Sequence, residues 1–164
     1  MCGIYAALTE KIGSVTLTSE AQKVLTRRGP DALAEHLDIG RGFHAWQSRL
    51  RIHDEISSGD DITETDHYVL LFNGELYNFD ELAIYLKLQT DNLTESALII
   101  HLIEKHGLNS LGIMEGMFAL ILFDKRANRI YFARDFVGIK PLYYRISAGG
   151  IEVGSQVRLF DAKT

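Results

Sequence analysis

The sequence opens with Met1-Cys2-Gly3-Ile4, and the apolar run from Gly3 to Leu8 is typical of a β-strand. Cys2 is the only cysteine in the chain. If Met1 is removed, Cys2 becomes the N-terminal residue and carries both a thiol and a free α-amine. That amine can serve as the base that activates the thiol. A lone cysteine is more often inert than catalytic, so this hypothesis depends on the rest of the chain.

Length and composition limit the kind of protein this is. With 164 residues, two prolines and no low-complexity stretch, the chain is expected to form one domain with its own core. A single cysteine and the absence of a signal-peptide pattern predict a cytoplasmic protein. The longest apolar run, Met117 to Phe123, is far shorter than the ~20 residues of a membrane helix, so no membrane span is expected. The net charge of −5, without a basic stripe, argues against nucleic acid and favours a small neutral or zwitterionic substrate.

The hydrophobic pattern predicts a strand-rich chain with three helices. The apolar stretch between Thr94 and His106 predicts a third helix buried between layers. Asn78 with Glu81, and Asn92 with Glu95, have the spacing of capping boxes at the second and third helices. We therefore expect two sheets packed face to face with helices outside. Strands are predicted at Gly3–Leu8, Ala34–Ile39, Gly42–Leu50, Tyr68–Phe72, Phe118–Asp124, Arg129–Arg134, Leu142–Ile146 and Ile151–Ser155, and helices at Ser19–Arg27, Phe79–Leu88 and Thr94–His106.

Four further motifs accompany the N-terminal cysteine. They are Arg27-Arg28-Gly29-Pro30-Asp31, Ser48-Arg49-Leu50-Arg51-Ile52, Asn73-Gly74-Glu75-Leu76-Tyr77-Asn78, and the stretch from Ala133-Arg134-Asp135 to Lys140-Pro141-Leu142-Tyr143-Tyr144. In order and spacing, these five pieces resemble the class-II glutamine amidotransferases, most closely the glutaminase domain of asparagine synthetase-like proteins. The resemblance implies an α+β fold of the N-terminal-nucleophile hydrolase type, a four-layer αββα sandwich with two mainly antiparallel sheets. It implies one glutaminase domain over residues 1–164, with no synthetase domain.

The same resemblance implies a reaction and its catalytic groups. Cys2 attacks the side-chain amide of L-glutamine, its α-amine moves the proton, and a γ-glutamyl thioester forms while ammonia leaves. Asn73 and Gly74 follow a predicted strand, so a turn there would aim an amide side chain and a backbone N–H at the oxyanion. The alternative for this pair is an ordinary Asn-Gly turn without a catalytic role.

The substrate-binding residues are also expected from the resemblance. Arg49 would hold the α-carboxylate, a task suited to a bidentate donor. Arg51 lies two residues on and would crowd or reinforce the site. Arg28 and Gly29 belong to a loop that covers bound glutamine, although Arg27 replaces the histidine usual in the family. Glu75 is expected in the substrate pocket.

One position departs from the family pattern. Before the third helix the family usually has Ser-Asp-Thr-Glu, whose aspartate holds the substrate ammonium, whereas this chain has Leu93 at that place. Leucine cannot pair with an ammonium group. Either Asp91 replaces the missing carboxylate, or glutamine binds weakly, or the domain accepts another amide.

Three interpretations remain open from the sequence. The first is a glutaminase domain that supplies ammonia to a synthetase domain or subunit, whose acceptor the chain does not name. The second is a catalytically decayed binding or regulatory module, and the third is an N-terminal-nucleophile hydrolase of another amide. No cofactor is expected under any of them. No metal is expected either, because His101 and His106 are five apart and miss the i, i+4 spacing of zinc-binding helices.

Overall fold

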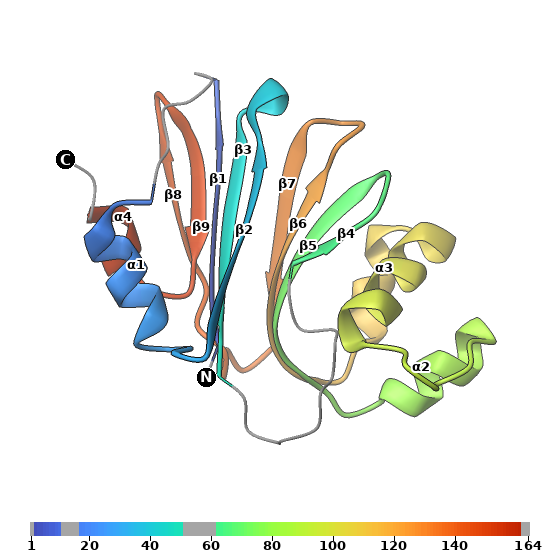
Figure 1. Ribbon diagram of the computed structural model, residues 1–164. Helices are drawn as coiled ribbons and strands as arrows, with labels where there is room; N and C mark the ends of the chain where they lie inside the picture. Colours follow the sequence, from blue (N-terminus) through green and yellow to red (C-terminus); the bar gives the residue numbers. More distant parts are fainter. Residues whose placement is uncertain (1, 11–16, 51–61, 162–164) are drawn as a thin grey trace.

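The computed structural model describes residues 2–10, 17–50 and 62–161, which form two antiparallel sheets (Figure 1). The five-stranded sheet has the order β2-β3-β1-β9-β8, and the four-stranded sheet has the order β4-β5-β6-β7. The first sheet comprises β1 (Gly3–Thr9), β2 (Ala32–Asp38), β3 (Phe43–Arg49), β8 (Tyr143–Ser147) and β9 (Gly150–Gly154). The second comprises β4 (Thr63–Glu64), β5 (Tyr68–Leu76), β6 (Gly116–Asp124) and β7 (Arg129–Arg134).

Helices cover the outer face of each sheet. Helix α1 (Ser19–Thr26) and the short α4 (Arg158–Asp161) lie on the five-stranded sheet, whereas α3 (Glu95–His106) lies on the four-stranded sheet and α2 (Phe79–Leu86) packs beside α3 (Figure 1). Two 3-10 turns, η1 (Ile39–Arg41) and η2 (Leu108–Ile113), complete the described elements. This arrangement confirms the predicted four-layer αββα sandwich.

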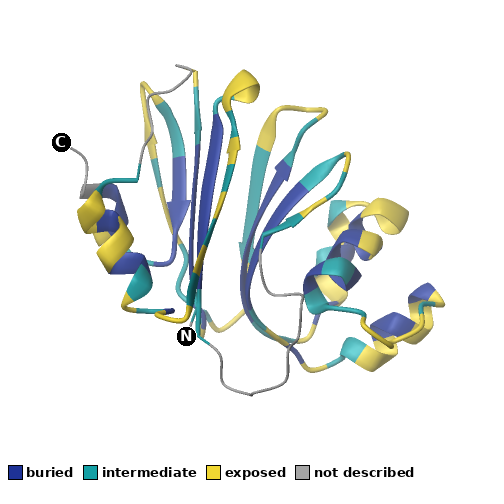
Figure 2. Ribbon diagram, in the orientation of Figure 1, coloured by how far each residue is buried: buried dark blue, intermediate teal, exposed yellow. Residues whose placement is uncertain are grey.

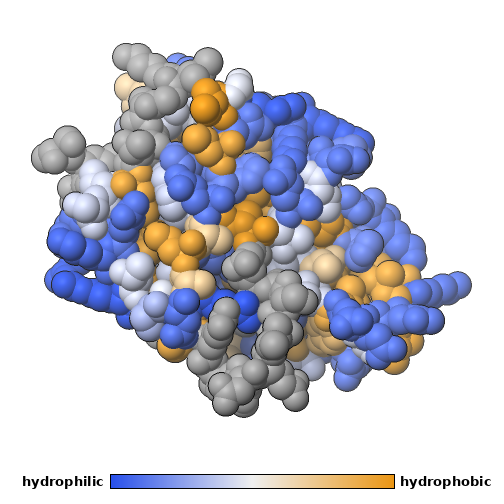
Figure 3. Space-filling view, in the orientation of Figure 1, coloured by the Kyte–Doolittle hydropathy of each residue, from blue (hydrophilic) through white to orange (hydrophobic). Residues whose placement is uncertain are grey.

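Strand alternation divides the core into layers, as the buried interior in Figure 2 shows. In β1, Ile4 and Ala6 face the other sheet, while Tyr5 and Ala7 face α1 and α4. All four side chains are fully buried because both faces of this central strand are covered. The face seen in Figure 3 is mainly hydrophilic, with separate apolar patches. The sandwich thus holds β1, the strand behind Cys2, at its centre.

The predicted Asn73-Gly74 turn is wrong. Strand β5 continues to Leu76, and Asn73 and Gly74 pair with Ala119 and Phe118 of β6. Gly74 permits this pairing, because a Cβ atom there would lie 2.4 Å from the Met117 carbonyl oxygen. The local turn preference of Asn-Gly is overridden by pairing with β6.

Both predicted capping boxes are also wrong. The cap of α3 is Thr94, whose hydroxyl accepts from the Ala97 N–H at 3.2 Å. Glu95 instead accepts a hydrogen bond from the Leu76 N–H, across to the end of β5. Asn78 makes no side-chain cap; its amide donates to the Ile113 carbonyl at 2.9 Å. These side chains therefore connect elements that are distant in sequence.

Helix α3 forms where predicted, but it is not buried between layers. Leu98, Ile99 and Leu102 are buried in the core cluster shared by α2, α3 and β5, whereas His101 and Glu104 are exposed. The exposed positions recur at helical spacing, which explains why an outer helix has so apolar a sequence. None of the helices in the described part of the chain has the length and hydrophobicity needed to cross a membrane.

Candidate active site

Cys2 directly precedes β1 and is partly exposed. By strand alternation it shares a face with Ile4 and Ala6, so its side chain is directed toward the space between the sheets. The β1–β3 register pairs Gly3 with Ser48, and its extension by one residue places Cys2 opposite Arg49. The nucleophile and the carboxylate-binding arginine predicted from the sequence are therefore neighbours across two strands.

The backbone beside Cys2 is held by two buried hydroxyls. The Gly3 N–H donates to Ser48 Oγ at 3.1 Å, and Ser48 Oγ donates to the Leu25 carbonyl at 2.8 Å. The Ile4 N–H donates to Ser155 Oγ at 3.0 Å. The start of β1 is thus fixed on both sides, as precise placement of a nucleophile requires. Neither serine was singled out from the sequence.

The loop that carries Arg28 and Gly29 lies against the backbone of β3. A Cβ atom at Gly29 would be 2.4 Å from the Arg49 nitrogen, so only glycine allows this approach. Pro30 forms a bridge with Arg49, and the Asp31 N–H donates to the Arg49 carbonyl at 3.0 Å. The loop therefore braces the strand end that presents the Arg49 side chain.

Arg28 reaches from this loop to Cys2. Its Nε donates to the Cys2 carbonyl at 3.1 Å. Burial lowers the pKa of Arg28, and the nearby Cys2 and Tyr143 act in the opposite direction. A guanidinium stays protonated under such shifts, so Arg28 places a positive charge beside Cys2.

Gln47 connects the two sheets close to the site. Its Nε2 donates to the Phe72 carbonyl and its Oε1 accepts from the Phe72 N–H, both at 3.2 Å. Gln47 lies two residues before Arg49, and Phe72 directly precedes Asn73. The bridge therefore brings the Cys2–Arg49 end of one sheet to the Asn73-Gly74 segment of the other.

The register of β5 and β6 determines where the Gly74 N–H points. Both main-chain groups of Phe118, its partner, bond Asp135 on the β7 side. Gly74 and Phe118 are thus a non-hydrogen-bonded pair, and the Gly74 N–H is directed away from β6. The N–H groups of Phe72 and Leu76 have this direction and bond Gln47 and Glu95. The Gly74 N–H lies in the gap between those two contacts.

Asn73, the residue before Gly74, supplies a second candidate donor. Its side chain is 3% exposed, and its Nδ2 is a buried donor without a hydrogen-bond partner among the described residues. It follows Leu71 on the face of β5 turned toward the other sheet, the side on which Cys2 lies. The other buried side-chain atom without a partner in the described residues is His36 Nε2 on β2, so it is the position of Asn73 beside the Cys2 end, and not the unpaired state alone, that makes its Nδ2 a candidate donor to a ligand.

Within the part of the chain that the structure describes, the other predicted substrate-binding residues are not brought into contact with Cys2. Glu75 is exposed and shares the Asn73 face of β5. Asp91 is exposed on the turn before α3, and Leu93 packs partly buried against the outer apolar cluster. Arg51 lies outside the described residues. Within the described ranges, no three His, Cys, Asp or Glu side chains gather as metal ligands.

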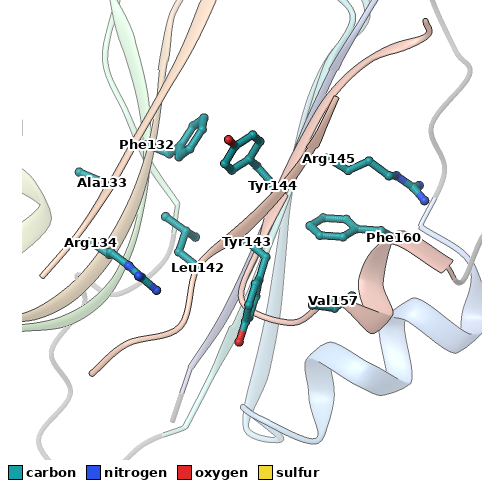
Figure 4. Close-up of a pocket in the computed structure, with 9 residues that line it drawn as sticks. All are labelled: Phe132, Ala133, Arg134, Leu142, Tyr143, Tyr144, Arg145, Val157 and Phe160. Carbon is teal, nitrogen blue, oxygen red and sulfur yellow. The ribbon is translucent and has the colours of Figure 1, made fainter. Parts of the chain in front are cut away.

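A separate groove of about 760 Å³ lies where the edge strands β7 and β8 face each other (Figure 4). Phe132 and Tyr144 face each other across it, while Tyr143 points to the other side of β8. Its lining is mostly aromatic and aliphatic, and it includes none of the residues predicted to bind glutamine. We do not assign this groove to the glutamine site.

The αββα sandwich, with Cys2 directly before its central strand β1, is the fold of the N-terminal-nucleophile hydrolases. The chain belongs to the glutamine amidotransferase family, since the family model described as "Glutamine amidotransferase domain" matches residues 1–164.

Similar proteins include the glutamine-hydrolysing asparagine synthetase 2 of Bacillus subtilis strain 168, at 35% identity over 122 residues (73% of this chain, 16% of the relative). The asparagine synthetase of Asparagus officinalis is 37% identical over 152 residues (87% of this chain, 25% of the relative). The asparagine synthetase 2 of Oryza sativa is 34% identical over 154 residues, with the same coverage of 87% and 25%. The chain thus spans a quarter or less of the length of these relatives.

Proposed function

We propose that this protein hydrolyses the side-chain amide of L-glutamine through Cys2 and supplies the ammonia to a synthetase domain or subunit. The observation that carries the proposal is the pair of donors at the Cys2 end of the sandwich. Asn73 Nδ2 is buried without a partner among the described residues, and the adjacent Gly74 N–H points into the gap between Gln47 and Glu95. Two such donors suit the oxyanion of a tetrahedral intermediate.

The reaction proceeds in two halves. The Cys2 thiol, deprotonated by its own α-amine, attacks the amide carbon, and the oxyanion forms between Asn73 and Gly74. The amine then gives its proton to the leaving nitrogen, so ammonia departs and a γ-glutamyl thioester remains. Water, activated by the same amine, attacks the thioester and releases glutamate with the thiol restored. The mechanism requires removal of Met1, because an amide-bonded Cys2 nitrogen cannot act as a base.

Two charged groups can hold the amino-acid end of glutamine. Arg49, opposite Cys2, takes the α-carboxylate, and the Arg28-Gly29 loop covers the bound substrate. For the ammonium we assign Glu75, because it lies on the same face of β5 as Asn73, two residues on. Asp91, on the exposed turn before α3, is the other candidate. Leu93 contributes packing but no charge.

The homologous asparagine synthetases support a synthetase partner, since each is much longer than the part that this chain matches. We also propose the cytoplasm as the compartment, because a catalytic thiol must stay reduced.

The test is glutamine turnover by the purified protein, with its N-terminal mass determined beforehand. Glutamate and ammonia should appear in equal amounts from protein that lacks Met1. Hydrolysis of other amides but not glutamine would favour a different hydrolase. Loss of any amide hydrolysis, despite correct processing, would favour a decayed binding module.

A further inference from the structure

Asp135 is a buried carboxylate to which the proposed reaction gives no role. It directly follows β7 and is 5% exposed. Its Oδ1 accepts from the Ile139 N–H at 2.8 Å, and its Oδ2 accepts from the N–H groups of Lys140 at 3.0 Å and Phe118 at 3.3 Å. Burial alone would raise the pKa of Asp135, but the backbone N–H donors outweigh it and lower the pKa. The Asp135 carboxylate therefore stays ionised and accepts hydrogen bonds from several backbone N–H groups.

The same residue is tied to β6 through its main chain. The Asp135 N–H donates to the Phe118 carbonyl at 2.8 Å, so Asp135 satisfies both main-chain groups of Phe118. It thereby extends the pairing of β6 and β7 by one position beyond Ala119 and Arg134. On the β7 side, the start of β6 is therefore held by Asp135, while its other side pairs with β5.

Phe118 lies directly against the proposed oxyanion donors. It is in register with Gly74, and its neighbour Ala119 is in register with Asn73. A Cβ atom at Gly74 would be 2.6 Å from Phe118 Cα, so the two backbones touch without an intervening side chain. A shift of Phe118 is therefore passed directly to the Gly74 N–H. Misplacement by about 1 Å is enough to cost catalysis two orders of magnitude.

We propose that Asp135 is a positioning residue for amide hydrolysis, which holds Phe118 and through it sets the placement of the Asn73 and Gly74 donors. The inference rests on the proposed glutaminase function. Asp135 does not touch the substrate; it fixes the strand against which the oxyanion hole is built.

The test is the Asp135→Asn variant, in which an amide NH₂ must face at least one backbone N–H. With glutamine as substrate we expect kcat to fall about tenfold to hundredfold, with KM changed less than about threefold, because a transition-state contact is misplaced. Asp124→Asn is the matched control. Asp124 ends β6 at the far end of the same strand pair, and its Oδ1 accepts from the Arg126 and Ala127 N–H groups, both at 2.9 Å. This control should keep the kcat of the wild type.

A double-mutant cycle separates positioning from general destabilisation. If Asp135 acts through the oxyanion donors, Asp135→Asn should cost less kcat in an Asn73→Ala background than in the wild type, because only the Gly74 N–H then remains to be misplaced. Independent losses that multiply fully would overturn the proposal, as would an unchanged kcat in Asp135→Asn or an equal loss in Asp124→Asn.

Should Asp135→Asn be unfolded at the assay temperature, Asp135→Glu keeps the charge and moves the oxygens outward by one methylene. A lowered kcat with little change in KM supports the proposal, and a wild-type kcat in the folded Glu variant overturns it. Absence of glutamine turnover in the wild type would instead refute the proposed function itself. A wild type that turns over glutamine beside an unaffected Asp135→Asn would refute only the role of Asp135.

Discussion

The two ends of the sandwich are built in different ways. At the end with Cys2, polar groups of both sheets face a shared space, and Asn73 Nδ2 is left without a protein partner in the described part of the chain. At the other end, charged and polar side chains contact one another: Glu64 of β4 lies 3.2 Å from His36 of β2, across the two sheets, and 2.5 Å from Lys125, which follows β6 in its own sheet. There, Arg41 Nε also donates to the Lys125 carbonyl at 3.0 Å.

The contrast separates groups that serve the fold from groups reserved for a ligand. An unpaired buried donor costs stability, and beside Cys2 it is available to a ligand, whereas the partly exposed pairs of Glu64 contribute modestly to stability. His36 Nε2 is also buried without a partner among the described residues, but it lies away from Cys2. Changes at the Cys2 end should therefore reduce turnover more than stability. Changes at the ion-paired end should do the reverse.

The largest effect is expected from Cys2→Ala. The variant lacks the nucleophile, so glutamate release should fall below detection while thermal unfolding stays near that of the wild type, because Cys2 lies outside the core clusters. Paired measurements of glutamate release and circular-dichroism melting check both halves. Residual turnover close to the wild-type rate would remove Cys2 from the mechanism.

The next largest effect on turnover is expected at Asn73, and the buried amide of Gln47 in the other sheet serves as its comparison. Asn73→Ala should lower kcat about 10²–10³-fold, the usual cost of an oxyanion donor. Its unfolding free energy should change by less than about 1 kcal/mol, because Asn73 Nδ2 has no hydrogen bond to the described residues that the change would break. Gln47→Ala should instead destabilise by about 1–3 kcal/mol, since it leaves both backbone groups of Phe72 unpaired. Steady-state kinetics and urea unfolding of both variants check this. A larger loss of stability in Asn73→Ala than in Gln47→Ala would contradict the prediction.

Arg49→Ala should weaken glutamine binding at least about tenfold, because a charge-assisted contact worth about 1.5–3 kcal/mol is lost. Calorimetric titration on a Cys2→Ala background measures this without turnover. Unchanged affinity would place the α-carboxylate elsewhere.

A smaller loss of glutamine affinity is expected when the carboxylate that pairs with the substrate α-ammonium is removed. Glu75 is exposed, so Glu75→Gln should weaken glutamine binding several-fold, by about 1 kcal/mol, and Asp91→Asn should have no effect. The same titration distinguishes the two carboxylates. The opposite result would assign the ammonium to Asp91.

The smallest effect on turnover is expected at the ion-paired end. The hydrogen bond from Lys125, aided by the charges of His36 and Lys125, lowers the pKa of Glu64 below its ordinary 4.5. Its stabilising contribution is therefore complete above pH 4.5 and lost as pH falls through the lowered folded-state pKa. Glu64→Gln should leave kcat unchanged and lower the unfolding free energy by less than about 1 kcal/mol at pH 7. Unfolding at a series of pH values should show the difference from the wild type disappear in acid.

The sequence predicted much of this architecture because apolar periodicity reports burial. Strands β1 and β7 and helix α3 lie close to their expected limits. It failed where tertiary contacts outweigh local preference, as when β6 draws the Asn73-Gly74 pair into a strand. The direction of the Gly74 N–H and the hydrogen bonds accepted by Asp135 depend on the register of β5, β6 and β7, which no local pattern encodes. The facing of Cys2 and Arg49 likewise depends on the β1–β3 register.

The most direct measurement is the intact mass of the protein after acid quenching during turnover of glutamine. The proposed mechanism predicts a transient adduct with the mass of glutamine less ammonia, mapped to an N-terminal peptide that begins at Cys2, and no adduct in Cys2→Ala. Rapid turnover by protein that retains Met1, or an adduct on any residue other than Cys2, would contradict the central claim.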